Sequence, residues 1–253
     1  MKNLATLIET LNELRLEAFA KNLEQTLDRN PESREVNLTM LTTLTQAELA
    51  MRGEKSIAYR IREAHFQQIQ TIETFDFNYN ASTKKIKNRY IKFLEAEPTA
   101  ADQGLCALFV GTSGLGKTHL ARALGYRHCQ QNKKVLTTTV NNMLLSLTTA
   151  ESTGTLRKTL DQYINPALLI IDEVGYVSLR ELESNLIFQV ISARYDRRRS
   201  TVVTTNRPFG EWNQIFHNDA IAHAILDRLA ERAEVFHVEG KSYRETHPQR
   251  LRS

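Results

Sequence analysis

The chain has 253 residues and contains no apolar run near the roughly 18 residues that a membrane-spanning helix needs. Its polar start, Met1-Lys2-Asn3, is unlike a secretory signal. Only two cysteines occur, Cys106 and Cys129, and their spacing fits neither a metal site nor a disulfide framework. Repeats and low-complexity tracts are also missing. We therefore expect a cytoplasmic protein with reduced thiols and no membrane partner.

Positive charge is only modestly in excess. The chain has 33 Lys and Arg against 29 Asp and Glu, which gives a formal net charge of +4. The excess lies beyond residue 100. Two clusters are locally basic: residues 84–92 hold five cations and no acid, and residues 197–199 are three arginines. A solvated surface is the more ordinary interpretation of each cluster, and a contact with nucleic acid is the alternative.

The periodicity of apolar residues divides the chain into three parts. In residues 1–75 they recur at helical intervals, which predicts a small all-helical N-terminal module. Residues 76–104 form a connector with a basic helix, and Pro98 to Gly104 are expected to be a polar linker. From residue 105 onward, buried strand-like runs alternate with helical patterns, with Asn141 as a helix cap after the second run. This alternation predicts a parallel sheet covered by helices on both faces. The expected strands are 105–110, 134–139, 167–171, 201–205 and 235–238.

A complete phosphate-binding loop follows the first expected strand. It has the spacing G-x-x-x-x-G-K-[ST] and consists of Gly111, Thr112, Ser113, Gly114, Leu115, Gly116, Lys117 and Thr118. The glycines let backbone N–H groups point at the phosphates of ATP, Lys117 adds a positive charge, and Thr118 supplies a hydroxyl ligand for Mg²⁺. The helix that begins there directs its positive dipole end at the anion. His119 is counted with the nucleotide-binding residues, although a helix-surface position is its more ordinary interpretation.

Two adjacent acids, Asp172 and Glu173, end the third expected strand. Ligands in parallel sheets collect outside the carboxyl ends of the strands, so both acids should face the phosphates. Asp172 would hold Mg²⁺, directly or through water. Glu173 would polarise the water that attacks the γ-phosphate. A cap for the next loop is the alternative for this pair.

Three further polar residues are weaker candidates. Asn206 closes the fourth expected strand and would orient the attacking water, whereas by itself it is an ordinary turn residue. Arg228 lies near the end of a helix and suits a finger donated to the nucleotide of a neighbouring subunit; the alternative is an ion pair with a surface acid. Arg244 would reach a phosphate or be a simple tail cation. If the interpretation of Arg228 is right, the active unit is an oligomer.

Five sequence blocks together resemble the IstB family, the AAA+ ATPase helpers of insertion-sequence transposition, which are related to DnaC-type helicase loaders and to DnaA. The resemblance covers nearly the whole chain. The blocks are Gly116-Lys117-Thr118-His119-Leu120-Ala121, Leu169-Ile170-Ile171-Asp172-Glu173-Val174-Gly175-Tyr176, Asn206-Arg207-Pro208-Phe209-Gly210-Glu211-Trp212, Ile225-Leu226-Asp227-Arg228-Leu229 and Gly240-Lys241-Ser242-Tyr243-Arg244.

The resemblance implies an α/β P-loop core of the AAA+ type with a five-stranded parallel sheet in the order 5-1-4-3-2. It also implies an ATPase that binds double-stranded DNA largely without sequence preference, self-associates on it with ATP, and presents it to a partner transposase as target. By matching position, Asp172 and Glu173 are the strand-end acids, Asn206 the sensor and Arg228 the finger. About fourteen residues follow the last expected strand, too few for a C-terminal helical lid, so Arg244 has no secure counterpart in the family. The N-terminal helical module would do part of the work of the lid, or would contact DNA or the partner.

Three other functions stay open. A replicative helicase loader of the DnaC type would have the same core and a different partner. A small-molecule kinase would need a second substrate pocket, of which the sequence gives no sign. A DNA scaffold that binds nucleotide without hydrolysis is disfavoured by the intact Glu173.

Overall fold

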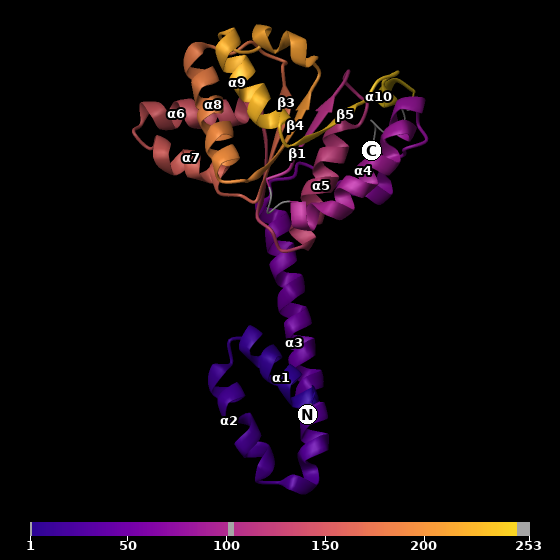
Figure 1. Cartoon of the computed structure of the whole chain (residues 1–253), viewed down its shortest axis with the longest axis vertical. Helices are drawn as coiled ribbons and strands as arrows, with labels where there is room; N and C mark the ends of the chain where they lie inside the picture. Colours follow the sequence, from indigo (N-terminus) through magenta and orange to yellow (C-terminus); the bar gives the residue numbers. More distant parts are fainter. Residues whose placement is uncertain (1, 101–103, 247–253) are drawn as a thin grey trace. The chain divides into compact units, whose positions relative to one another are not determined.

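The computed structural model describes residues 2–100 and 104–246, with the side chains of residues 4–96, 104–243 and 245. The chain forms two compact units, Met1–Tyr59 and Arg60–Ser253. Residues 60–75, which the sequence pattern groups with the helical module, thus belong to the larger unit (Figure 1). No helix of the described part is both long enough and apolar enough to span a membrane.

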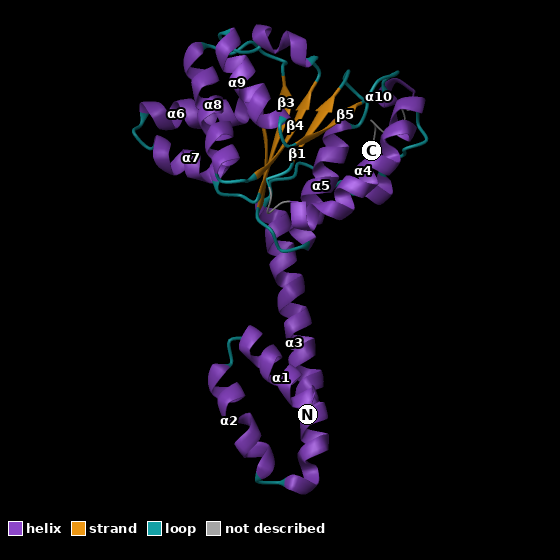
Figure 2. Cartoon of the chain, in the orientation of Figure 1, coloured by secondary structure: helices purple, strands orange, loops and turns teal. Residues whose placement is uncertain are grey.

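The smaller unit is entirely helical (Figure 2). It contains α1 (Lys2–Glu13), α2 (Glu17–Asp28) and most of α3 (Arg34–Glu63), which continues into the larger unit. Leu7 and Leu11 are fully buried and pack against Leu23 and Leu27 of α2. The four-residue spacing of these leucines places them on one face of each helix, which is why two short helices bury a shared core.

The larger unit alternates strands and helices from residue 104 onward. Its helices are α4 (Ala81–Ala100), α5 (Lys117–Gln130), α6 (Val140–Ser152), α7 (Leu156–Ile164), α8 (Glu181–Asp196), α9 (Asp219–Ala230) and α10 (Tyr243–Thr246). Its strands are β1 (Cys106–Val110), β2 (Val135–Thr139), β3 (Leu168–Val174), β4 (Ser200–Thr205) and β5 (Ala233–His237).

All strand pairs are parallel, in the order β2-β3-β4-β1-β5. Read from the other edge this is 5-1-4-3-2, so the order implied by the family resemblance is confirmed. Successive residues of a strand face opposite sides: Ala107 and Phe109 pack with α4 and α5, and Leu108 packs with α6, α8 and α9. Helices therefore cover both faces of the sheet (Figure 1), and the carboxyl ends of β1, β3 and β4 meet at one edge.

Two local predictions are wrong. α4 continues to Ala100, so the expected polar linker is helical from Pro98 to Ala100; the strong helix formers just before Pro98 carry the helix on. Residues 101–103 of the expected linker lie outside the described part of the chain. The cap of α6 is Thr139 and not Asn141, because β2 runs directly into the helix and Thr139 Oγ1 accepts a 3.2 Å hydrogen bond from the N–H of Asn142.

Candidate nucleotide-binding site

The loop of residues 111–116 joins β1 to α5 and is held at its base by backbone contacts. The N–H of Gly111 donates to the carbonyl of Thr205 on β4 over 3.1 Å, and the N–H of Val238 donates to Val110 over 2.8 Å. Gly111 has φ +153°, and a Cβ there would lie 1.9 Å from the carbonyl oxygen of Val238. Only glycine fits this position, so the first glycine of the motif has a structural cause.

Lys117 and Thr118 form the first turn of α5. Lys117 is 8% exposed, and its Nζ donates to the carbonyl of Thr112 over 2.7 Å. The hydroxyl of Thr118 donates to Asp172 Oδ1 over 2.9 Å. A cleft of about 590 Å³ opens at this point, within the size range of small-molecule sites. It is lined by residues 67–70, 74–76, 79, 113–119, 122, 139, 172, 173, 176, 204, 205 and 243.

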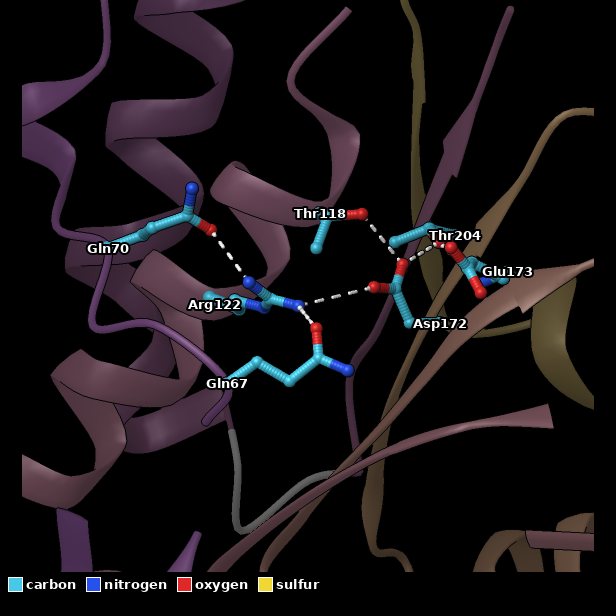
Figure 3. A network of polar contacts seen from close by, with 7 residues as sticks. All are labelled: Gln67, Gln70, Thr118, Arg122, Asp172, Glu173 and Thr204. Carbon is cyan, nitrogen blue, oxygen red and sulfur yellow. Dashed lines mark hydrogen bonds and ion pairs between the residues drawn. The ribbon is translucent and has the colours of Figure 1, made fainter. Parts of the chain in front are cut away.

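Asp172 and Glu173 point in different directions although they are neighbours on β3 (Figure 3). Asp172 is 4% exposed, and its Oδ1 also accepts a hydrogen bond from the hydroxyl of Thr204. The side chain of Glu173 is exposed, its φ is +66°, and the pairing of β3 with β4 shifts register between Ile171 and Val174. A left-handed non-glycine residue is strained, and such residues cluster at functional sites. The irregularity turns one acid inward and the other into the cleft.

Thr204 connects the two acids. Its Oγ1 donates to Asp172 and accepts a 3.0 Å hydrogen bond from the N–H of Glu173. The hydroxyl therefore satisfies the backbone N–H of the strained residue.

The oxygens of Thr118 and Asp172 fit a magnesium ion. Mg²⁺ prefers oxygen ligands and keeps several waters or substrate phosphates, so it needs few protein groups. Within the described residues, no group of three or more His, Cys, Asp or Glu side chains is placed to hold a metal ion by itself. The backbone of residues 111–116 and the ammonium of Lys117 fit a triphosphate.

His119 lines the cleft and is tied to the segment before α4. Its Nε2 donates to the carbonyl of Thr71 over 2.8 Å, and its ring packs edge-on against Phe75 with centroids 5.1 Å apart. Burial lowers the pKa of His119, so the ring is neutral at neutral pH. Phe75 also packs against Gly116. The phosphate-binding loop is therefore covered by residues 71–75.

Asn206 and Arg228 do not line the cleft. Asn206 directly follows β4, and its Oδ1 is buried beside Gly175 without a hydrogen-bond partner among the described residues. Arg228, on α9, donates to the carbonyl of Ala224 over 2.9 Å, and its guanidinium lies 5.0 Å from the ring centroid of Phe188. The structure thus gathers Lys117, Thr118, Asp172 and Glu173 at one cleft and leaves Arg228 outside it. The side chain of Arg244 lies outside the described residues.

The sequence motifs do not identify two residues of this site, Thr204 and Arg122. Arg122 is 9% exposed and lies beside Asp172. One signal for it is in the sequence, since Arg122 follows Thr118 by one helical turn and interrupts the apolar run from Leu120 to Leu124. Nothing in the alternation of β4 distinguishes Thr204 from its neighbours.

The two basic clusters differ in their surroundings. On α4, Lys84, Lys85 and Lys92 are exposed, whereas Arg89 pairs with Glu234 and lies over the ring of Phe236. The arginines 197–199 form an exposed turn after α8.

Comparison with known proteins identifies relatives over nearly the whole chain. The model of a family described as IstB-like ATP binding protein matches residues 9–251. A protein of insertion sequence IS5376 from Geobacillus stearothermophilus, named for ATP binding, is 34% identical over 204 residues, which cover 81% of this chain and 79% of the relative. A similarly named protein of IS232 from Bacillus thuringiensis subsp. berliner is 31% identical over 245 residues, 96% of each chain.

Solved structures share the fold over about two thirds or more of this chain. The crystal structure of the DnaC helicase loader superposes with a TM-score of 0.59 at 21% identity, covering 66% of this chain and 96% of that one. DnaA from Aquifex aeolicus bound to AMPPCP also gives a TM-score of 0.59, at 17% identity, covering 74% of this chain and 56% of that one. The α/β fold with a five-stranded parallel sheet that the resemblance implies is therefore confirmed.

Proposed function

The chain belongs to the family of IstB-like ATP binding proteins, and from this premise we propose that it is an ATPase that assembles on double-stranded DNA and helps a transposase to capture target DNA. The observation that carries the proposal is the convergence of Lys117, Thr118, Asp172 and Glu173 on one cleft. Binding of ATP requires only Lys117, Thr118 and Asp172. Hydrolysis also requires a base for the attacking water, and the exposed carboxylate of Glu173, which lines the cleft, fits this role.

Each residue has a distinct task in this mechanism. Lys117 and the loop N–H groups hold the β- and γ-phosphates, and Thr118 and Asp172 hold Mg²⁺. The ion, when bound, neutralises the charge that develops on the phosphates. Glu173 accepts the proton of the attacking water. Thr204 accepts a hydrogen bond from the N–H of Glu173 and so fixes the backbone from which its carboxylate projects.

Arg228 supports the expectation of a shared site. Its guanidinium is half-buried on α9 and does not line the cleft of its own chain, so it can act on a nucleotide only in a neighbouring subunit. Asn206 stands at the end of β4 with an amide oxygen that has no partner among the described residues. Asn206 is kept as the proposed sensor because of its matching position in the family, although its side chain does not line the cleft.

DNA and the transposase are proposed as partners on separate grounds. Several relatives are named as proteins of insertion sequences, which supports a role in transposition. The net charge of +4 and the exposed lysines of α4 favour contact with phosphates, so binding should weaken steeply as salt is raised. A replicative helicase is the alternative partner. Capture of a purified transposase but not of a helicase would distinguish the two.

A subunit-mixing experiment tests the shared site. Glu173→Gln removes the proposed base, and Arg228→Ala removes the proposed arginine finger. A finger of this type accelerates hydrolysis by about 10³–10⁵-fold. Each variant alone should release phosphate at least about 100-fold more slowly than the parent on duplex DNA, while retaining ATP binding. In an equimolar mixture roughly a quarter of the interfaces combine an intact Glu173 with an intact Arg228, so activity should return to about that fraction.

A mixture as slow as either variant alone would contradict the shared site. Parental phosphate release that responds to a metabolite and not to DNA would instead favour the kinase, and no release would favour the scaffold.

A further inference from the structure

Arg122 is a buried cation beside the acid that is proposed to hold magnesium. It lies on α5 one turn after Thr118, so both side chains reach Asp172 from the same helix face (Figure 3). Its Nη2 is 3.9 Å from Asp172 Oδ2 and donates to Gln67 Oε1 over 3.0 Å. Its Nη1 donates to Gln70 Oε1 over 3.4 Å. The side chain is 10% exposed.

Burial makes this charge costly to keep. Removal from water lowers the pKa of Arg122, and the charges of Asp172 and Glu173 oppose that effect. Its Nε has no hydrogen-bond partner among the described residues. An apolar side chain of similar volume would fill the same space without this penalty. The contacts of the guanidinium, rather than its packing, are therefore the feature to explain.

The two oxygens of Asp172 have different neighbours. Oδ1 accepts hydrogen bonds from the hydroxyls of Thr118 and Thr204, whereas Oδ2 lies 3.9 Å from Nη2 of Arg122, an ion-pair distance. The two hydroxyls therefore hold Oδ1, and the charge of the guanidinium attracts Oδ2. The positive charge also lowers the negative potential that a divalent cation meets at this acid.

We propose that Arg122 is a positioning residue of the magnesium site, which orients Asp172 and keeps the affinity for the divalent cation lower than the acids alone would give. The inference rests on the proposed function, because it assigns the metal to Asp172. Gln67 and Gln70 hold the guanidinium from the other side, so it keeps its place between the two amides and the carboxylate.

Removal of the Arg122 guanidinium should change two quantities in opposite directions: the affinity for Mn²⁺ should rise and the kcat for ATP should fall. In Arg122→Met, Mn²⁺ should bind the complex with ADP about tenfold more tightly, a change of about 1.4 kcal/mol, because a neighbouring positive charge is gone. The kcat for ATP should fall about tenfold, because Asp172 loses the charge that attracts Oδ2 and helps to orient the carboxylate. Arg122→Lys keeps the charge without the planar fork, so it should show parental Mn²⁺ affinity and a reduced kcat.

The experiment titrates Mn²⁺ into protein with saturating ADP and measures the free ion by electron paramagnetic resonance. Arg127→Met is the matched control, since Arg127 is an exposed cation on the same helix, and it should change neither quantity. Thermal unfolding checks each variant. If Arg122→Met does not fold, the comparison of Arg122→Gln with Arg122→Lys carries the same test, with tighter Mn²⁺ binding expected for Gln.

Unchanged or weaker Mn²⁺ binding in the neutral variants would overturn the inference, because a merely structural residue would not tighten the metal. The titration needs no hydrolysis. A parent that binds Mn²⁺ and ADP but releases no phosphate would therefore refute the proposed function and leave this test valid.

Discussion

The substitution Thr204→Val tests whether the two acids depend on one hydroxyl. Valine has nearly the shape of threonine, so packing at this buried position on β4 is retained. The change removes the donor to Asp172 Oδ1 and the acceptor for the N–H of Glu173. The strained, left-handed backbone of Glu173 then loses the side-chain contact that holds it.

The expected magnitudes follow from the two lost hydrogen bonds. A bond to a charged group contributes about 1.5–3 kcal/mol and a neutral bond about 0.5–1.5 kcal/mol, so the free energy of unfolding should fall by about 2–4 kcal/mol. For a chain of this size that corresponds to a decrease in Tm of roughly 5–15 °C. A displacement of the Glu173 carboxylate by about 1 Å should lower kcat by about 100-fold.

The matched control is Thr201→Val on the same strand. Thr201 is 2% exposed, and its Oγ1 accepts a 3.0 Å hydrogen bond from Nε of the fully buried Arg194, on the opposite face of the sheet from Thr204. This variant should lose stability to a similar degree and keep its kcat. Phosphate release gives kcat, and circular dichroism gives Tm. If Thr204→Val melts earlier but hydrolyses ATP at the parental rate, the proposed linkage of the two acids is refuted.

Two further predictions concern the phosphate-binding loop and a buried thiol. Gly111→Ala places a Cβ against the carbonyl of Val238, so it should lower Tm and weaken ATP binding at least about tenfold. In Gly210→Ala the added Cβ meets nothing within 4 Å, so this control should change neither quantity. Equal affinities of the two variants for ATP would contradict the geometry. Burial raises the pKa of Cys129 from 9.0 to about 12, so in a Cys106→Ala background iodoacetamide at pH 8 should react about 10³-fold more slowly with the folded than with the unfolded chain. Between pH 9 and about 12 the folded chain keeps a proton that the unfolded chain has lost, so this thiol makes the free energy of unfolding fall as pH rises, and a rise in that range would contradict the assignment.

The order of the strands and the place of the cleft could be predicted because they depend on local patterns and on one specific motif. Buried runs of strand length separated by helical periods leave few arrangements for a parallel sheet. The resemblance to a family then selects the order 5-1-4-3-2, which the structure confirms. The positions of Lys117 and Asp172 at one edge follow from that order. Their chemical roles remain proposals.

Other features could not be predicted because they depend on long-range contacts. Residues 71–75 cover the phosphate-binding loop through His119 and Phe75, which are more than forty positions apart. The register shift that turns Glu173 outward arises from the pairing of β3 with β4, and the periodicity of β3 alone does not show it. The helix α4 continues into the expected linker as far as Ala100 because local propensity exceeded the effect of a single proline.

The proposed tasks of Thr204 and Arg122 differ because they contact different oxygens of the same carboxylate. Thr204 reaches Oδ1 from β4 and also holds the backbone of Glu173, so its loss should act on the water-activating group and hence on kcat. Arg122 faces Oδ2 from α5 and contributes a full charge, so its loss should act on the metal as well. Because β3 lies beside β4 in the sheet and packs against α5, Asp172 is the point at which both contacts converge. A variant of Thr204 therefore tests the orientation of the two acids through kcat. A variant of Arg122 also tests the effect of charge, through the affinity for Mn²⁺.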